Sequence, residues 1–168
     1  YETKTSYSVT VTVTDGVNPV TQNITVSVTN VNDISPVISS SATFSAAENQ
    51  TAIGTVTATD AESDSLTYAL SGTDAASFSI SSGGVLTFKT APDYETKSSY
   101  SVTVTVTDGV NPVTQEITVS VTNVNDISPV ISSSATFTAA ENQTAIDTVT
   151  ATDAESDSLT YALSGTDA

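Results

Sequence analysis

The stretch NVNDISP at residues 30–36 returns unchanged at residues 123–129, and the rest of the chain is arranged around these two copies. Each copy follows a β-rich segment and ends with a proline, which lacks the N–H needed for strand pairing. Asn and Asp fill three of its first four positions, and an extended segment directs alternate side chains to opposite sides. Because such a segment offers oxygen atoms in several directions, we expect a metal-holding joint between domains. A plain polar linker is the alternative.

Both copies belong to a repeat that spans the chain. Residues 1–75 align with residues 94–168 at a distance of 93 residues, and the two copies differ at four positions. These positions are Thr5/Ser98, Asn23/Glu116, Ser45/Thr138 and Gly54/Asp147. A unit of this length is too long for a solenoid repeat and fits one Ig-like sandwich. We therefore expect the end of one domain at residues 1–34, a complete domain at 35–127 and the beginning of a third at 128–168.

Strand patterns predict an all-β fold for the complete domain. The clearest strand covers residues 100–107, where a tyrosine and three valines alternate with serine and threonine. A second alternating segment follows at residues 117–122, after turn signals at residues 108–112. Further strands are expected within residues 37–46, 52–59, 66–70, 78–81 and 85–89. This pattern predicts tandem seven-stranded Greek-key sandwiches of the Ig-like class, without an amphipathic helix.

Charge and composition restrict the function. The 168 residues include 19 acidic side chains, three lysines and no histidine or cysteine, with a formal net charge of −16. A field of this sign repels nucleic acid and anionic membranes and attracts cations. No apolar run reaches the roughly 18 residues of a membrane span. The chain also lacks a nucleophile motif, so we expect no enzyme. A disulfide-free chain rich in Ser, Thr, Asp and Asn favours a secreted bacterial protein.

Strand direction should bring acidic side chains to the two ends of the complete sandwich. If each strand reverses the direction of the one before it, the turns after alternate strands lie at the same end. The end beside residues 30–36 then collects Glu2, Asn30, Asn32, Asp33, Asp60, Glu62 and Asp108. The end beside residues 123–129 collects Glu48, Asp93, Glu95, Asn123, Asn125, Asp126, Asp153 and Glu155.

These side chains need a cation. Two carboxylates about 5 Å apart repel each other by roughly 3 kcal/mol at an effective dielectric constant near 20. Three lysines cannot neutralise two such groups, and ligation by oxygen alone favours Ca²⁺ over zinc or magnesium. We predict that both groups bind Ca²⁺.

The order of these motifs resembles a cadherin repeat of the kind found in large bacterial surface adhesins. The resemblance rests on Glu48, Asp60-Ala61-Glu62, Asp93-Tyr94-Glu95, Asp108 and the two linkers. It implies Ca²⁺ at each linker, an extracellular location and a role in adhesion. The chain departs from the family pattern at three kinds of position. Asn30 and Asn123 replace a linker Asp, Glu62 and Glu155 replace the second Asp of Asp-x-Asp, and Ile34 and Ile127 replace the last linker Asn.

We therefore expect a calcium-rigidified extracellular spacer or adhesion repeat of a long surface or secreted protein. Its partners are then neighbouring repeats of the same chain or copies of itself, with no nucleic acid and no membrane insertion. Two alternatives remain open. Residues 1–34 resemble the end of a domain and residues 128–168 its beginning, so copies could complete a sandwich between them and form a filament. The other alternative is a ligand-binding accessory module of a secreted polysaccharide enzyme.

Overall fold

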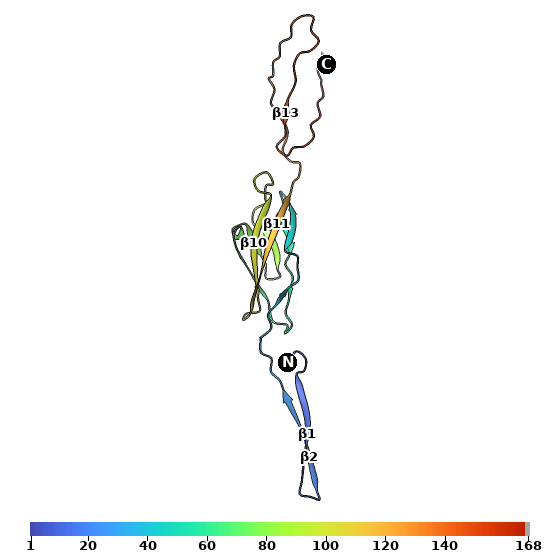
Figure 1. Cartoon of the computed structure of the whole chain (residues 1–168), viewed down its shortest axis with the longest axis vertical. Helices are drawn as coiled ribbons and strands as arrows, with labels where there is room; N and C mark the ends of the chain where they lie inside the picture. Colours follow the sequence, from blue (N-terminus) through green and yellow to red (C-terminus); the bar gives the residue numbers. More distant parts are fainter. Residues whose placement is uncertain (167–168) are drawn as a thin grey trace.

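The computed structural model describes residues 1–166 and shows an elongated molecule with three parts in a row (Figure 1). A hairpin of β1 (Ser6–Thr14) and β2 (Pro19–Ser27) lies at one end. A two-layer sandwich built from β3 to β11 lies in the middle. The other end carries one short strand pair, β12 (Val130–Ile131) and β13 (Ala151–Thr152). Residues 30–36, the first joint, and residues 123–129, the second joint, connect these parts.

The sandwich has one sheet of four strands and an opposite sheet of shorter strands. The first sheet has the order β4 (Thr43–Ala47), β11 (Pro112–Thr122), β10 (Ser99–Thr107) and β7 (Thr67–Ser71). The second has the order β5 (Ala52–Thr55), β9 (Val85–Phe88) and β8 (Phe78–Ile80), and β3 (Val37–Ile38) pairs with β6 (Ala58–Thr59). All pairs are antiparallel except β4 with β11. These sheets confirm the predicted all-β sandwich.

The first predicted strand is divided between the two sheets, which the sequence did not indicate. β3 pairs with β6, whereas β4 crosses to the opposite sheet and pairs with β11. Between them, the N–H groups of Ser39 and Ser40 donate to the carbonyl oxygen of Thr57 (2.9 and 3.4 Å). The hydroxyl oxygen of Ser41 accepts the N–H of Thr43 (3.1 Å). Such local bonds interrupt strand pairing, so one apparent strand serves both layers.

The core lies between the sheets and follows the predicted alternation. Val102, Val104 and Val106 of β10 are at most 1% exposed, and Ile117 and Val119 of β11 are fully buried. The opposite sheet and its flanks contribute Val56, Phe78, Leu86 and Phe88. The only helical element described in residues 1–166 is a single 3₁₀ turn, η1 (Ala75–Ser77), so no described helix is long and apolar enough to cross a membrane.

The hairpin of β1 and β2 has the sequence pattern and register of β10 and β11. Ser6 pairs with Ser27 in the hairpin, as Ser99 pairs with Ser120 in the sandwich. Within the described residues, however, β1 and β2 form a two-stranded sheet of their own. Val9 is therefore 55% exposed, whereas its counterpart Val102 is 1% exposed. The hairpin forms locally, but burial of its apolar face requires a second sheet.

Candidate metal centres

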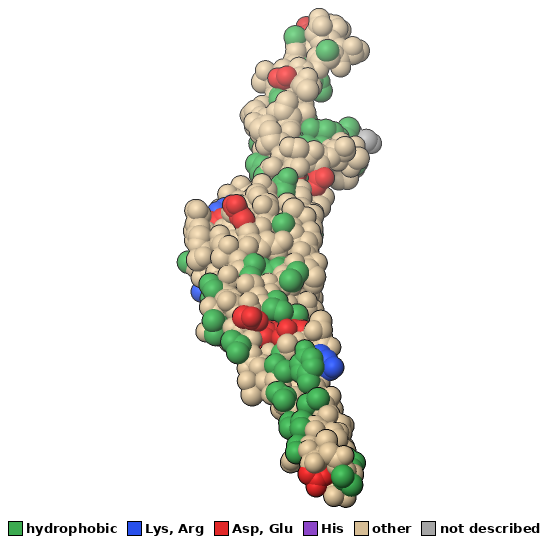
Figure 2. All heavy atoms as spheres, turned by 60° about the horizontal axis from the view of Figure 1, so that its bottom comes forward, with side chains coloured by type: hydrophobic (Ala, Val, Ile, Leu, Met, Phe, Trp, Pro, Cys, Tyr) green, Lys and Arg blue, Asp and Glu red, His purple; other side chains and the backbone are tan. Residues whose placement is uncertain are grey.

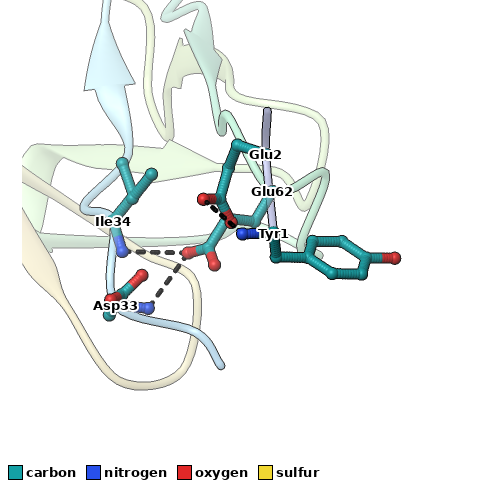
Figure 3. A network of polar contacts seen from close by, with 5 residues as sticks. All are labelled: Tyr1, Glu2, Asp33, Ile34 and Glu62. Carbon is teal, nitrogen blue, oxygen red and sulfur yellow. Dashed lines mark hydrogen bonds and ion pairs between the residues drawn. The ribbon is translucent and has the colours of Figure 1, made fainter. Parts of the chain in front are cut away.

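Glu62 connects the sandwich to the first joint. It lies in the turn after β6, and its Oε2 accepts the N–H groups of Asp33 (3.0 Å) and Ile34 (2.9 Å). Figure 3 shows this contact, with the carboxylate of Glu2 beside Glu62. Carboxylate oxygens of Glu2, Asp33 and Glu62 lie within 4.8 Å of one another. Three segments that are distant in sequence therefore present negative charge at one place.

Acidic side chains are also gathered on the molecular surface between the hairpin and the sandwich (Figure 2). Asp60, which precedes Glu62 in the same turn, is half-buried there. Its Oδ1 accepts the N–H of Glu62 (2.8 Å) and thereby fixes the turn. The structure thus places four of the predicted acidic residues, Glu2, Asp33, Asp60 and Glu62, around the first joint.

Asp108 lies beside the first joint, where its backbone carbonyl oxygen accepts the side-chain amide of Asn32 (3.4 Å). Its Oδ1 accepts the N–H groups of Val110 (2.8 Å) and Asn111 (2.6 Å) in the turn after β10. The Asn111 side chain donates to Asp108 Oδ2 (3.1 Å) and to Asn32 Oδ1 (2.9 Å). Desolvation opposes ionisation of Asp108, but the N–H groups of Asn111 and Val110 outweigh it and lower its pKa below the ordinary 3.8. Among residues 1–166, Asp108 belongs to no group of three convergent carboxylates.

Glu48 lies at the centre of the second joint. Only 2% of this residue is exposed, although β4 ends directly before it. Its Oε2 accepts the N–H of Tyr94 (2.9 Å), and its Oε1 accepts the N–H of Val124 in the joint (2.7 Å). Two groups of carboxylate oxygens within 4.8 Å of one another share Glu48: one with Asp93 and Glu95, the other with Asp126 and Glu155. The second joint therefore brings together acids from the sandwich, the joint and the following segment.

Glu155 repeats at the second joint the contact that Glu62 makes at the first. Its carboxylate accepts the N–H groups of Asp126 (3.1 Å) and Ile127 (2.9 Å). The side-chain amide of Asn49 donates to the carboxylate of Asp126. Asn49 lies next to Glu48, and its role was not inferred from the sequence. The contact between this glutamate and the joint backbone is thus formed at both joints.

The acids of the second joint repel one another. Desolvation raises the pKa of Glu95 above its ordinary 4.5, and the carboxylates of Glu48, Glu155 and Asp93 raise it further. By contrast, Asp93 accepts bonds from the side chain and the N–H of Thr96, which lower its pKa. Within residues 1–166, no lysine forms an ion pair with a carboxylate of either joint. The N-terminal ammonium of Tyr1 pairs with Glu2 at the first joint (3.5 Å), and the other joint carboxylates form no ion pair among the described residues.

Three predicted amide ligands are present at the joints but are not held in place. Asn30, Asn123 and Asn125 are exposed, and none of them forms a side-chain hydrogen bond to a residue in the described part of the chain. Asn32, in contrast, is half-buried through its contact with Asn111. Asp153 Oδ1 accepts the N–H of Glu155 (2.9 Å), as Asp60 does for Glu62.

Asp64 is a further acidic residue at the first joint that the sequence reasoning missed. Carboxylate oxygens of Asp60, Glu62 and Asp64 lie within 4.8 Å of one another, and those of Asp153, Glu155 and Asp157 form the same group one repeat later. The available signal was the alternation of three acids in the sequence DAESD at residues 60–64.

The donor atoms suit a calcium ion. Asp60 Oδ2, Glu62 Oε1 and Asp64 Oδ2 are buried and have no hydrogen-bond partner among the described residues. Buried polar atoms are normally paired, and a cation is a partner that would satisfy these three oxygens together. All candidate donors are carboxylate, amide or backbone oxygens, the ligands that Ca²⁺ prefers. Sites rich in histidine or cysteine, which suit zinc, cannot form in this chain.

Comparison with known proteins identifies the sandwich. The family model described as "Cadherin domain" matches residues 42–123. The sandwich is an all-β domain of the cadherin type. Cadherin domains are extracellular adhesion modules without enzymatic activity, and they bind Ca²⁺ between successive repeats. The match confirms the predicted resemblance to a cadherin repeat and the expectation that the chain is not an enzyme.

The relatives are animal proteins. The mouse cadherin-related family member 2 is 38% identical over 74 residues, which are 44% of this chain and 6% of the relative. A human protocadherin-24 EC1-2 structure is 28% identical, with a TM-score of 0.56 over 60% of this chain and 49% of that one. The protocadherin gammaB7 EC3-6 cis-dimer structure is also 28% identical, with a TM-score of 0.69 over 78% of this chain and 36% of that one. None of these relatives supports a bacterial adhesin, which stays a prediction.

Cadherin repeats pack in tandem. Mouse protocadherin-24 EC1-3 is 22% identical, with a TM-score of 0.67 over 91% of this chain and 57% of that one. At this identity the likeness concerns the fold alone. The chain spans about half or less of the first relatives named above, so their whole-protein activities are not transferred to it.

Proposed function

We propose that this chain is part of a calcium-stiffened extracellular spacer in a long surface or secreted protein. In this proposal, residues 1–34 end one cadherin repeat, residues 35–127 form a complete repeat and residues 128–168 begin the next. The observation that carries it is the second joint, where buried Glu48 lies among carboxylates from three segments of the chain. No lysine within residues 1–166 pairs with these carboxylates.

Contacts within each joint support the stiffening. Glu62 and Glu155 each accept two joint N–H groups, so the loop after β6 and its copy after β13 hold the backbone of the preceding linker. Glu48 holds the second joint from the opposite side through the N–H of Val124. The backbone of each linker is therefore held by hydrogen bonds at several residues. Repulsion between the surrounding carboxylates is the force that still favours bending of the linker.

Several residues would hold calcium at each joint. At the first joint they are Glu2, Asp33, Asp60 and Glu62, with Asn30, Asn32 and Asp108 as further oxygen donors nearby. At the second joint they are Glu48, Asp93, Glu95, Asp126 and Glu155, with Asn123, Asn125 and Asp153 nearby. Bound calcium supplies the positive charge that neutralises the converging carboxylates. Because these carboxylates come from both sides of each linker, their shared ligation would prevent the two sides from separating.

Calorimetric titration with CaCl₂, together with thermal unfolding in CaCl₂ and in EDTA, tests this proposal. We expect heat of binding with dissociation constants of about 10⁻⁴ to 10⁻³ M, the range of extracellular calcium modules. Because calcium binds the folded joints, the unfolding temperature should be higher in CaCl₂ than in EDTA. An absence of heat together with identical unfolding temperatures would contradict the proposal.

A second candidate, pairing between copies, is favoured by the exposed hairpin. Side chains of β1 and β2 that are exposed, such as Val9 and Ile24, correspond to Val102 and Ile117, which are buried in the sandwich. This face needs a cover. In a longer protein the rest of the same repeat provides it, and between copies of this chain residues 128–166 would provide part of it. Sedimentation of the chain over a range of concentrations separates the two cases, because only pairing produces a concentration-dependent increase in mass.

A further inference from the structure

We propose that Asp64, and Asp157 in the next copy, add a carboxylate to the calcium-binding oxygens of Asp60 and Glu62, and of Asp153 and Glu155. The loop after β6 would then supply three carboxylates to one cation from five consecutive residues. The inference rests on the proposed function, because the cation is the same Ca²⁺. It extends that function because the motifs that predicted the joints give Asp64 no role.

The loop places the three carboxylates together by its own hydrogen bonds. Asp60 Oδ1 accepts the N–H groups of Glu62 (2.8 Å) and Asp64 (3.2 Å). Glu62 uses Oε2 to hold the joint backbone at Asp33 and Ile34. Each of these two acids therefore has one engaged oxygen and one that is free of the joint's hydrogen bonds.

The free oxygens are the strongest observation. One oxygen from each of the three acids, Asp60 Oδ2, Glu62 Oε1 and Asp64 Oδ2, is buried without a hydrogen-bond partner among the described residues. Carboxylate oxygens of the three acids also lie within 4.8 Å of one another. An unpaired buried acceptor is costly, and three that belong to one cluster of negative groups are costlier still. A cation bound among them removes both the repulsion and the lack of partners.

Asp74 is a carboxylate of the same sandwich whose two oxygens both have partners, in contrast to Asp64. Its Oδ1 accepts from the Lys97 ammonium (2.5 Å), and its Oδ2 accepts the N–H of Ser101 (2.8 Å). No lysine within residues 1–166 forms an ion pair with Asp64. The loop is also repeated: Asp153 Oδ1 accepts the N–H groups of Glu155 (2.9 Å) and Asp157 (3.3 Å). The chain therefore builds the same three-acid loop at both joints.

The test compares the wild type with the double variant Asp64→Asn/Asp157→Asn by CaCl₂ titration and by thermal unfolding in CaCl₂ and EDTA. The control is Glu116→Asn, an exposed acid of β11 whose counterpart in the other copy is Asn23. We expect the double variant to bind Ca²⁺ about tenfold more weakly, because the number of charged ligands sets affinity. In EDTA its unfolding temperature should equal or exceed that of the wild type, since one repelling charge has been removed from each of the two loops. The control should behave as the wild type in both assays.

The outcomes separate this inference from the proposed function. If the wild type binds Ca²⁺ and the double variant binds as tightly as the control, Asp64 is not a ligand and only this inference fails. If the wild type gives no heat, the proposed function fails as well. If the asparagine variant is less stable than the wild type in EDTA, its weaker Ca²⁺ binding could come from damage to the fold. The variant Asp64→Glu/Asp157→Glu, which keeps both negative charges, is then titrated with CaCl₂ as well. If the glutamate variant binds Ca²⁺ with an affinity closer to that of the wild type than to that of the asparagine variant, Asp64 is a ligand. If its affinity falls as far as that of the asparagine variant, the inference is overturned.

Discussion

Glu48 shows how one residue connects the fold to the joint. Among residues 1–166 it is the one charged side chain that is buried, and a buried charge is stable only when it is paired or hydrogen-bonded. Its two oxygens accept one N–H from the sandwich, at Tyr94, and one from the joint, at Val124. Glu48 therefore stabilises the joint before any metal is considered, and it also contributes negative charge to both groups of acids.

Substitution of Glu48 should destabilise the protein even in EDTA. Glu48→Ala leaves the N–H groups of Tyr94 and Val124 without their acceptor, which should lower the free energy of unfolding by about 2–4 kcal/mol. Urea unfolding in EDTA measures this change. Its copy Glu141 is exposed, so Glu141→Ala is the matched control and should have little effect. Equal effects of the two substitutions would show that burial of Glu48 contributes nothing.

Gly54 is one of the four positions at which the two copies differ, and its surroundings predict that a larger residue there lowers the stability of the sandwich. A Cβ atom on Gly54 would lie 2.9 Å from two ring carbons of Phe44, which is closer than real contacts allow. The next copy has Asp147 at this place. Gly54→Asp should therefore lower the free energy of unfolding by about 1–3 kcal/mol through overpacking.

Thermal unfolding of Gly54→Asp and of the reciprocal Asp147→Gly checks this prediction. Asp147 lies in a part of residues 128–166 without strand pairing, so its replacement should leave the sandwich unchanged. An unaltered unfolding temperature for Gly54→Asp would mean that the Phe44 ring moves aside without cost.

At the scale of elements, strand formation was predictable, whereas pairing and burial depended on distant residues. The alternation in residues 100–107 and 117–122 predicted β10 and β11 and their core side chains. The same alternation in β1 leaves Val9 exposed, because burial is decided by a second sheet and not by the strand itself. The division of the first strand between two sheets was missed for a related reason, since its two partners, β6 and β11, lie far away in sequence.

The candidate site was predictable in outline and less so in its atoms. Motif order and strand direction placed Glu48, Glu62 and Glu155 at the joints, where the structure finds them. Strand direction could not show that the turn after β10 would occupy the carboxylate of Asp108 with its own N–H groups. Asp64 was overlooked because its role depends on which oxygens remain unpaired, a property of the folded loop. Metal binding and the domain boundaries stay predictions.

The link between η1 and β10 gives a prediction about pH. The Lys97 side chain and the N–H of Ser101 lower the pKa of Asp74 below its ordinary 3.8. Because the pKa is lower in the folded state, the resulting stability is present above about pH 4 and is lost as pH falls through the folded value. Asp74→Asn should lower the free energy of unfolding at pH 7 by about 1 kcal/mol, allowing for the exposure of Lys97.

Urea unfolding of wild type and Asp74→Asn in EDTA, from pH 7 down to about 3, measures this effect. The difference between the two proteins should be constant near neutral pH and shrink in acid. Lys97→Gln should cause a similar loss, and the double variant should lose less than the sum, because the two residues form one ion pair. A difference that grows in acid, or additive losses, would contradict the assignment.

At the scale of the whole molecule, the two joints separate the three parts of the elongated shape and also carry the clusters of acidic side chains. The three parts follow one another along the long axis (Figure 1), and each change of part coincides with a cluster of acids. In the proposed function, a straight chain of repeats with a net charge of −16 depends on cations at these places. Removal of calcium should therefore change the overall dimensions and leave the strands of the central sandwich intact.

Small-angle X-ray scattering of the 168-residue chain in CaCl₂ and in EDTA tests this account most directly. The account predicts a larger maximum dimension and a narrower range of shapes in CaCl₂ than in EDTA, with unchanged strand content by circular dichroism. Scattering curves that superimpose in the two buffers, at concentrations where the chain is monomeric, would contradict it.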